Sequence, residues 1–128
     1  MATEQNKAML WGGRVMSALP VLALVMSSMM KLSHSAALVD GWQKGGFPAG
    51  SLTPIGAFEL ACAILYAVPR TTAFGAVLMT GYLGGACATH IRAGESFAAP
   101  LIIATLAWVG LFLREPRLRA LVPLRKPD

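Results

Sequence analysis

Charged residues are scarce in this sequence. Only 13% of its 128 residues are Asp, Glu, Lys or Arg, whereas 55% are hydrophobic and the mean hydropathy is +0.59. A soluble domain carries roughly 25% charged residues, and a domain this small has a large surface for its volume. The chain cannot cover such a surface with polar groups, so we expect lipid to solvate much of it.

The motifs of several function classes are also missing. The sequence contains no nucleotide-binding loop, no zinc-ligand spacing and no Ser/His/Asp arrangement, so we predict no metal site. The net charge is +5, but five of the eleven Lys and Arg residues fall within 114–128, directly after an apolar segment. No basic and aromatic residues alternate there, so we interpret these charges as membrane-flanking and predict no nucleic-acid partner.

Four apolar segments are present instead. They are 16 to 18 residues long, near the lower limit of about 17 to 25 residues for a membrane-spanning helix. Their ranges are 15–30, 52–68, 72–89 and 98–113. Pro69 and Arg70 separate the second from the third, because the residue before a proline disfavours helix. The sequence therefore predicts an all-α, membrane-embedded four-helix bundle, with 1–128 as a single transmembrane domain.

The basic residues predict an orientation. With both termini inside, the inner cations number eight and the outer cations three, whereas the opposite orientation inverts this bias. The inner set is Lys7, Arg14, Arg70, Arg114, Arg117, Arg119, Arg125 and Lys126, and the outer set is Lys31, Lys44 and Arg92. We therefore predict cytoplasmic termini, with the polar loop from Ser33 to Ser51 outside and Trp42 and Phe47 as interfacial anchors.

Glu59 lies in the middle of the second apolar segment. An ionisable group there is expensive and normally faces the bundle interior or a wet cavity. It is either a functional group, acting as proton carrier, ligand anchor or catalytic acid, or a structural hydrogen-bonding group between two helices. Helical spacing places Gly56, Cys62, Ala63 and Tyr66 on the same face.

The third segment supplies partners for Glu59. If segments two and three are antiparallel about Pro69 and Arg70, residues 80–82 lie at the depth of Glu59, so Thr80 or Tyr82 is its expected partner. The same count separates Cys62 and Cys87 by about 12 Å of helical rise. A disulfide needs Cα atoms within about 7 Å, so we predict two free thiols.

Small and polar residues continue along the third segment. Gly81 and Gly85 form a GxxxG pattern and Gly84 lies on a neighbouring face, so we expect all three at helix–helix contacts. His90 and Arg92 end the segment. His90 is an interfacial hydrogen-bonding residue, a proton relay or a haem ligand, and Arg92 pairs with a carboxylate, a headgroup or a ligand.

The fourth segment contains Trp108, whose indole N–H needs a partner. Thr105 lies on roughly the same helical face and is the neighbour expected from spacing. We expect ligand contacts from residues around Glu59 and toward the outer surface, namely Cys62, Tyr66, Thr80, Arg92 and Trp108.

Residues 50–124 resemble a known family. They contain the block FELACAILYAVPRTTAFGAVLMTGYLGGACATHIRAG, followed by WVGLFLREPRLRALVP. This combination is similar to the DoxX-like proteins of bacteria. Members often carry an acidic residue shortly before a lysine at the end of the first helix, whereas here Ser27 and Ser28 precede Lys31. The resemblance implies a multi-pass inner-membrane protein with a four-helix bundle, and an association with quinone-linked or redox-stress complexes.

Three functions follow. The first is a quinone- or redox-linked membrane subunit in which Glu59, Tyr82 and His90 handle protons or bind a quinone head, with haem through His90 as a weaker cofactor alternative. The second is a small membrane enzyme with Glu59 as general acid or base. The third is a non-catalytic scaffold or assembly factor that uses the glycine faces to grip a redox partner protein or a second copy of the chain.

Overall fold

The computed structural model describes residues 6–125 and residue 127, and the described residues form helices joined by short connections. In chain order the elements are α1 (Lys7–Ser33), α2 (Ala36–Lys44), the 3₁₀ turn η1 (Ala49–Ser51), α3 (Leu52–Ala67), α4 (Thr72–Arg92), α5 (Ala98–Arg114) and α6 (Pro116–Arg119). The predicted all-α class is confirmed. The polar loop predicted from Ser33 to Ser51 is wrong in part, because it contains α2 and η1.

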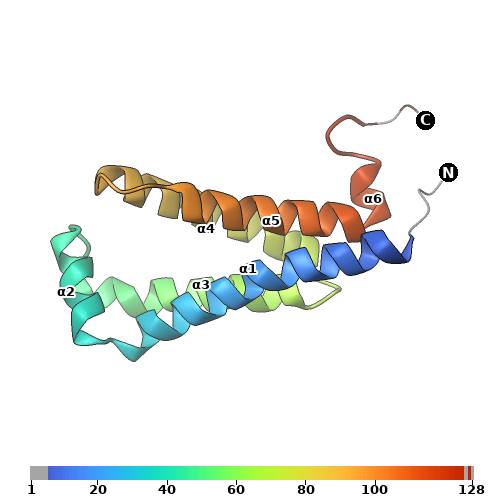
Figure 1. The fold of residues 1–128 in the computed structure, drawn as a ribbon. Helices are drawn as coiled ribbons and strands as arrows, with labels where there is room; N and C mark the ends of the chain where they lie inside the picture. The colour runs from blue at the N-terminus through green and yellow to red at the C-terminus, as the bar shows by residue number, and fades with distance from the viewer. Residues whose placement is uncertain (1–5, 126, 128) are drawn as a thin grey trace.

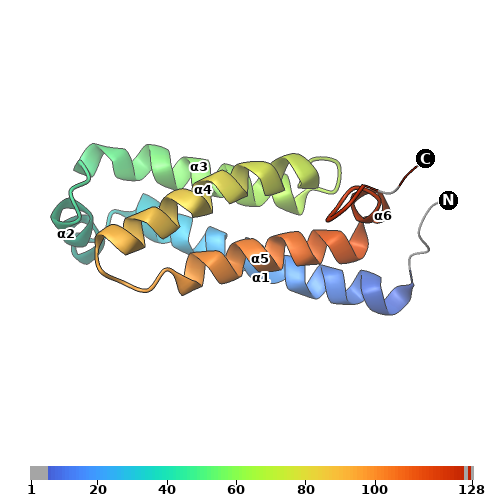
Figure 2. The same ribbon diagram turned by 90° about the horizontal axis from the view of Figure 1, so that it is seen from above.

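The four long helices pack as an elongated bundle (Figure 1). In this bundle α1 contacts α3 and α5, and α4 contacts the same two helices. The short helix α2 lies at one end, and α6 lies at the other end beside the start of α1, as both views show (Figure 2). Each long helix therefore presents one side to its neighbours and one side outward.

Local sequence explains the boundaries of the helices. The Asn6 side chain accepts the Met9 N–H at 2.8 Å and caps the start of α1. Val68 is extended before Pro69, and this ends α3 at the predicted turn. α1 is longer than predicted, because the polar residues before its apolar stretch, such as Lys7 and Arg14, continue the same helix.

The bundle is lined inside by apolar side chains of mixed size. The buried core consists of Leu24, Cys62, Ala63, Tyr66, Ala76, Met79, Leu83, Ala107 and Leu111. Large apolar side chains also cover the outside. Those exposed along α1 are Trp11, Val15, Leu19, Leu22, Met26, Met29 and Met30. Their spacing of three or four residues makes one continuous apolar face, which a soluble protein rarely exposes.

Two helical segments have the length and apolarity needed to cross a membrane. They are Lys7–Ser33 and Ala49–Ala67, and the apolar helix Ala98–Arg114 is shorter. These segments and the apolar outer face indicate a membrane-embedded protein. The finer prediction of four spans with both termini inside stays a prediction.

The glycines that allow close helix packing differ from those predicted. A Cβ added at Gly75 would overlap the backbone nitrogen of Tyr66, and one at Gly110 would lie 2.5 Å from Ser17 Oγ. At Gly81, Gly84 and Gly85 an added Cβ would meet no atom within 4 Å. The prediction that these three lie at helix contacts is therefore wrong within this chain, because no described part of a neighbouring helix comes close enough to them.

Candidate functional site

A buried ion pair joins α1 to α3. The Lys31 Nζ lies 2.9 Å from Glu59 Oε2, and the same ammonium donates to Ser27 Oγ at 2.6 Å. The Glu59 side chain is 1% exposed and that of Lys31 is 15% exposed. Opposite charges compensate each other at a depth where either one alone would be costly. Lys31 was counted among the outer cations, and the structure adds that its side chain turns inward to the carboxylate.

Gly56 makes this approach of α1 to α3 possible. It lies one helical turn before Glu59, and a Cβ added there would lie 3.1 Å from Lys31 Cβ and 3.3 Å from side-chain atoms of Leu32. A side chain at this position would crowd these atoms, which would have to shift by a few tenths of an ångström or more. The absence of a side chain at Gly56 thus brings the lysine within reach of the carboxylate.

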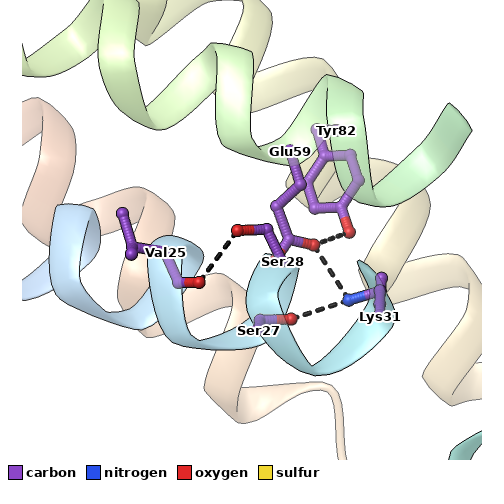
Figure 3. A network of polar contacts seen from close by, with 6 residues as sticks. All are labelled: Val25, Ser27, Ser28, Lys31, Glu59 and Tyr82. Atoms are coloured by element: carbon purple, nitrogen blue, oxygen red, sulfur yellow. Dashed lines mark hydrogen bonds and ion pairs between the residues drawn. The ribbon is translucent and has the colours of Figure 1, made fainter. Parts of the chain in front are cut away.

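Tyr82 joins the pair from α4. Its hydroxyl donates to Glu59 Oε2, so Lys31 and Tyr82 share one carboxylate oxygen (Figure 3). This contact confirms Tyr82 as a partner of Glu59. Thr80, the other predicted partner, instead donates to the Ala76 carbonyl at 2.7 Å and accepts the Trp108 indole N–H at 2.6 Å. We call Ser27, Lys31, Glu59 and Tyr82 the polar cluster.

The polar cluster has unused hydrogen-bonding capacity. The second carboxylate oxygen, Glu59 Oε1, is buried and has no partner among the residues that the structure describes. A lysine ammonium has three N–H donors, and two of those of Lys31 are used, by Ser27 and Glu59. One acceptor and one donor are therefore open to a further molecule. Buried polar atoms are rarely left without a partner, which makes the Oε1 atom informative.

A cavity of about 190 Å³ lies beside the polar cluster, between α1, α4 and α5. Its lining includes all four members of the cluster, together with His90 and apolar side chains of α1, α4 and α5. The small-enzyme hypothesis requires an open space beside Glu59, and this cavity meets that requirement.

A second cavity, of about 380 Å³, reaches the polar cluster from the α2 side. Lys31 and Tyr82 line it together with His90, and Gly81 and Gly85 form part of its wall. Trp42 and Phe47, whose rings stack with centroids 4.6 Å apart, cover the cavity at the end of the bundle where α2 lies. The Trp42 indole donates to Ser51 Oγ at 2.8 Å, which fixes the cover in place.

His90 lines both cavities. Its Nδ1 lies 2.7 Å from the Ala86 carbonyl oxygen, so the ring is held against its own helix. No hydrogen bond joins His90 to Glu59 in the described part of the chain, as the helical rise between them predicts. A role for His90 therefore depends on a ligand or water that spans the cavity.

Most of the other predicted ligand contacts lie away from the polar cluster, whereas Cys62, about one helical turn after Glu59, lies close to it but lines neither cavity. Tyr66 is fully buried nearer the opposite end, where its hydroxyl donates to the Ala107 carbonyl at 2.6 Å and lies 2.9 Å from the Ser17 hydroxyl oxygen. Cys62 is buried in the core. Arg92 lines a separate surface pocket with Lys44 and Glu95. The structure therefore brings Glu59, Tyr82 and His90 together at one cavity, but not these residues.

Two further predictions concern single side chains. Trp108 bonds to Thr80 rather than to its own-helix neighbour Thr105, which donates to the Leu101 carbonyl at 2.8 Å. Cys62 and Cys87 are both free thiols, as predicted. Within the described residues, no group of three His, Cys, Asp or Glu side chains could hold a metal ion.

Sequence reasoning missed Lys31 and Ser27 as site residues. Lys31 is the third-last residue of α1, and a lysine near the end of a membrane helix normally extends outward to the lipid headgroups. The available signal was the spacing of four between Ser27 and Lys31, which places both on one helical face. This spacing identifies Ser27 and Lys31 as site residues only once the structure shows that Glu59 of α3 faces that side of α1.

Comparison with protein-family models gives one match. The model of the DoxX-like family matches residues 15–110, which include all four members of the polar cluster. No curated protein and no solved structure shows significant similarity to the chain.

Proposed function

The chain belongs to the DoxX-like family, and from this membership and the polar cluster we propose that it is a quinone-binding membrane subunit of a redox system. The observation that carries the proposal is the buried Glu59 carboxylate, which is paired on one oxygen and open on the other beside a cavity.

The open groups of the polar cluster match the head of a quinone. A quinone carbonyl accepts a hydrogen bond, which the third N–H of Lys31 supplies, and a quinol hydroxyl donates one, which Glu59 Oε1 accepts. Bonds to charged partners are stronger than those between neutral groups. The same cluster therefore recognises both redox forms without any change of helix position.

The two cavities provide room for an apolar ring and the start of its tail. Their volumes are about 190 and 380 Å³, and only the larger cavity lies within the range typical of small-molecule sites. The larger cavity has an aromatic cover in Trp42 and Phe47 and open backbone at Gly81 and Gly85. A flat ring can lie against this glycine wall with its polar edge toward Lys31 and Tyr82.

A quinone takes up two electrons and two protons when it is reduced. The electrons in this proposal come from a flavin or metal centre of a partner redox protein. The residues of this chain bind the head group and hold protons. Tyr82 and Lys31 each donate a hydrogen bond to Glu59 Oε2, so the three side chains form one hydrogen-bonded group at the cavity wall. His90, which lines both cavities, is the residue placed to pass protons toward the outer end.

We also propose that the four long helices cross a bacterial inner membrane as one transmembrane domain with both termini inside. The excess of eight inner cations over three outer ones supports this orientation. Polar α2 then lies at the outer surface, where it covers the larger cavity.

Quinone retention tests the proposal. The protein, Glu59→Gln and a matched control, Asp40→Asn, are purified in mild detergent, and the quinone in a solvent extract is measured per protein. Asp40 also forms an ion pair of 2.9 Å, with Lys44, but that pair is exposed. We expect wild type and Asp40→Asn to retain quinone equally, and Glu59→Gln to retain roughly tenfold less, since a lost charge-assisted bond costs about 1.4 kcal/mol or more.

Two outcomes would overturn the proposal. One is wild-type protein that neither retains quinone nor binds an added short-tailed quinone. The other is equal retention in wild type, Glu59→Gln and Tyr82→Phe, which would show that bound quinone is carried by the detergent micelle rather than by the polar cluster.

The open glycines favour a second candidate, a scaffold that grips a partner helix on α4. Gly84 and Gly85 both have free space for a side chain, but only Gly85 lines the larger cavity. A partner helix on the Gly84 face requires Gly84 to stay small, whereas quinone binding requires only Gly85. A pulldown with Gly84→Leu and with Gly85→Leu is combined with the quinone assay. Loss of association in Gly84→Leu with quinone retained supports the scaffold, and loss of quinone in Gly85→Leu alone supports the quinone subunit.

A further inference from the structure

A basic groove lies at the end of the bundle opposite α2. It has a volume of about 670 Å³ and is bordered by the turn between α3 and α4, by the end of α5 and by α6. Its lining residues are Pro69, Arg70, Thr72, Ala73, Val77, Trp108, Leu111, Arg114, Glu115, Arg117, Leu118 and Leu121. In Figure 1 this is the end at which α6 turns away from the axis of α5.

Three arginines from three separate elements meet at this groove. Arg70 comes from the turn after α3, Arg114 is the last residue of α5, and Arg117 lies in α6. The described ion pairs include none of them. Arg114 donates its Nε–H to the neutral Ser17 Oγ at 3.0 Å. Among the described residues, the groove therefore holds three cations without a paired counter-charge.

The one carboxylate in the groove is committed to the backbone. Glu115 Oε1 accepts the N–H of Arg117 at 3.0 Å and caps the short helix α6. Even with the full charge of Glu115 counted against the three arginines, the groove stays positive. Guanidinium groups bind phosphate oxygens well, because their planar fork of N–H donors matches the phosphate geometry.

The wall beside the arginines is apolar. Val77 and Leu121 are each 59% exposed, and Trp108 also lines the groove with its indole N–H already bonded to Thr80. A free phosphate would use the arginines and leave this wall in contact with water. An occupant that carries both an anionic head and a long apolar chain uses both parts of the groove.

We propose that this groove binds an anionic phospholipid of the leaflet at the α6 end. The phosphate lies among Arg70, Arg114 and Arg117, and one acyl chain lies along Val77 and Trp108. The inference rests on the membrane placement proposed above, because cytoplasmic leaflets carry anionic lipids that attract clustered Lys and Arg. It does not depend on quinone binding, whose cavities lie nearer the α2 end.

Lipid selection from a mixed bilayer tests the groove. The protein is placed in nanodiscs of equal phosphatidylglycerol and phosphatidylcholine, released, and examined by native mass spectrometry for retained lipid. The test variant is Arg70→Gln with Arg117→Gln. The control is Lys7→Gln with Arg14→Gln, which removes the same charge at the same end but outside the groove. Thermal unfolding of all three proteins checks that the variants fold.

We expect the wild type and the control to prefer phosphatidylglycerol, and the test variant to lose roughly tenfold or more of this preference. Equal retention of both lipids by wild type would overturn the proposal. An equal loss in the control would also overturn it, by showing that only net charge matters. Full displacement by inorganic phosphate would show a simple anion site without use of the apolar wall.

Quinone content is measured in the same samples. If the test variant loses phosphatidylglycerol and keeps quinone, the lipid site is independent of the polar cluster, as proposed. If wild type holds phosphatidylglycerol but no quinone, the proposed function fails while the lipid site stands. The two failures are therefore distinguishable in one experiment.

Discussion

Lys31 and Glu59 form a 2.9 Å ion pair that ties the end of α1 to the first half of α3. The pair is withdrawn from solvent, and the Tyr82 hydroxyl reaches it from a third helix. It thereby links three of the four long helices. It also leaves Glu59 Oε1 open beside a cavity, so one contact serves the fold and defines the candidate site.

Removal of Lys31 should strongly destabilise the bundle. In Lys31→Met the Glu59 carboxylate stays buried without its counter-ion, which typically costs about 3 to 5 kcal/mol. The control Lys44→Met breaks an exposed pair, whose side chains are 76% and 64% exposed, and should cost well under about 1 kcal/mol. Thermal unfolding in mild detergent measures both. Adding Glu59→Gln to Lys31→Met should recover part of the loss, and equal melting temperatures for the two lysine variants would contradict the prediction.

The two tyrosines of the chain should separate stability from ligand binding. Tyr66→Phe removes a buried hydroxyl that is hydrogen-bonded to Ala107 and Ser17, so it should cost about 1 to 2 kcal/mol and leave quinone retention unchanged. Tyr82→Phe removes the hydroxyl at the polar cluster and should lower retention. Unfolding and quinone content are measured on both variants. A loss of quinone in Tyr66→Phe alone would place the site at the wrong end of the bundle.

A methyl group at Gly75 should disrupt the α3–α4 contact. In Gly75→Ala the added Cβ would overlap the backbone of Tyr66, with the Leu65 carbonyl carbon 2.7 Å away, so the helices must separate. The matched change Gly84→Ala meets open space and gains helix propensity of up to about 1 kcal/mol. We expect a large fall in melting temperature for the first variant and no fall for the second. Similar behaviour of both would refute the assignment of the packing glycine.

Cysteine labelling tests the orientation. In a background with Cys62→Ala and Cys87→Ala, Gly46→Cys places a thiol just after α2, and Leu121→Cys places one after α6. A membrane-impermeant maleimide added to intact spheroplasts should label the first and spare the second, because the inner cations outnumber the outer ones. Permeabilised cells, in which both should react, provide the control. Labelling of the second thiol alone would reverse the proposed topology.

Several features of the fold follow from nearby residues. The approximate ranges of α3, α4 and α5, the turn at Pro69 and the pairing of Tyr82 with Glu59 were predicted, since each depends on helical rise and on one tight turn. The packing role of Gly81, Gly84 and Gly85 was not predicted correctly. A GxxxG pattern shows that close approach is allowed on that face, but it does not say whether any helix lies there.

The sequence by itself determined that the chain is helical and apolar and that a carboxylate lies within an apolar segment. Only the tertiary structure decided that Lys31 neutralises this carboxylate, that Gly56 rather than Gly81 is the close contact near it, and that Arg70, Arg114 and Arg117 share one groove. Helix boundaries depend on residues within a few positions of each other. A contact between helices depends on the rotation and depth of each helix, and these are fixed only when all four pack together.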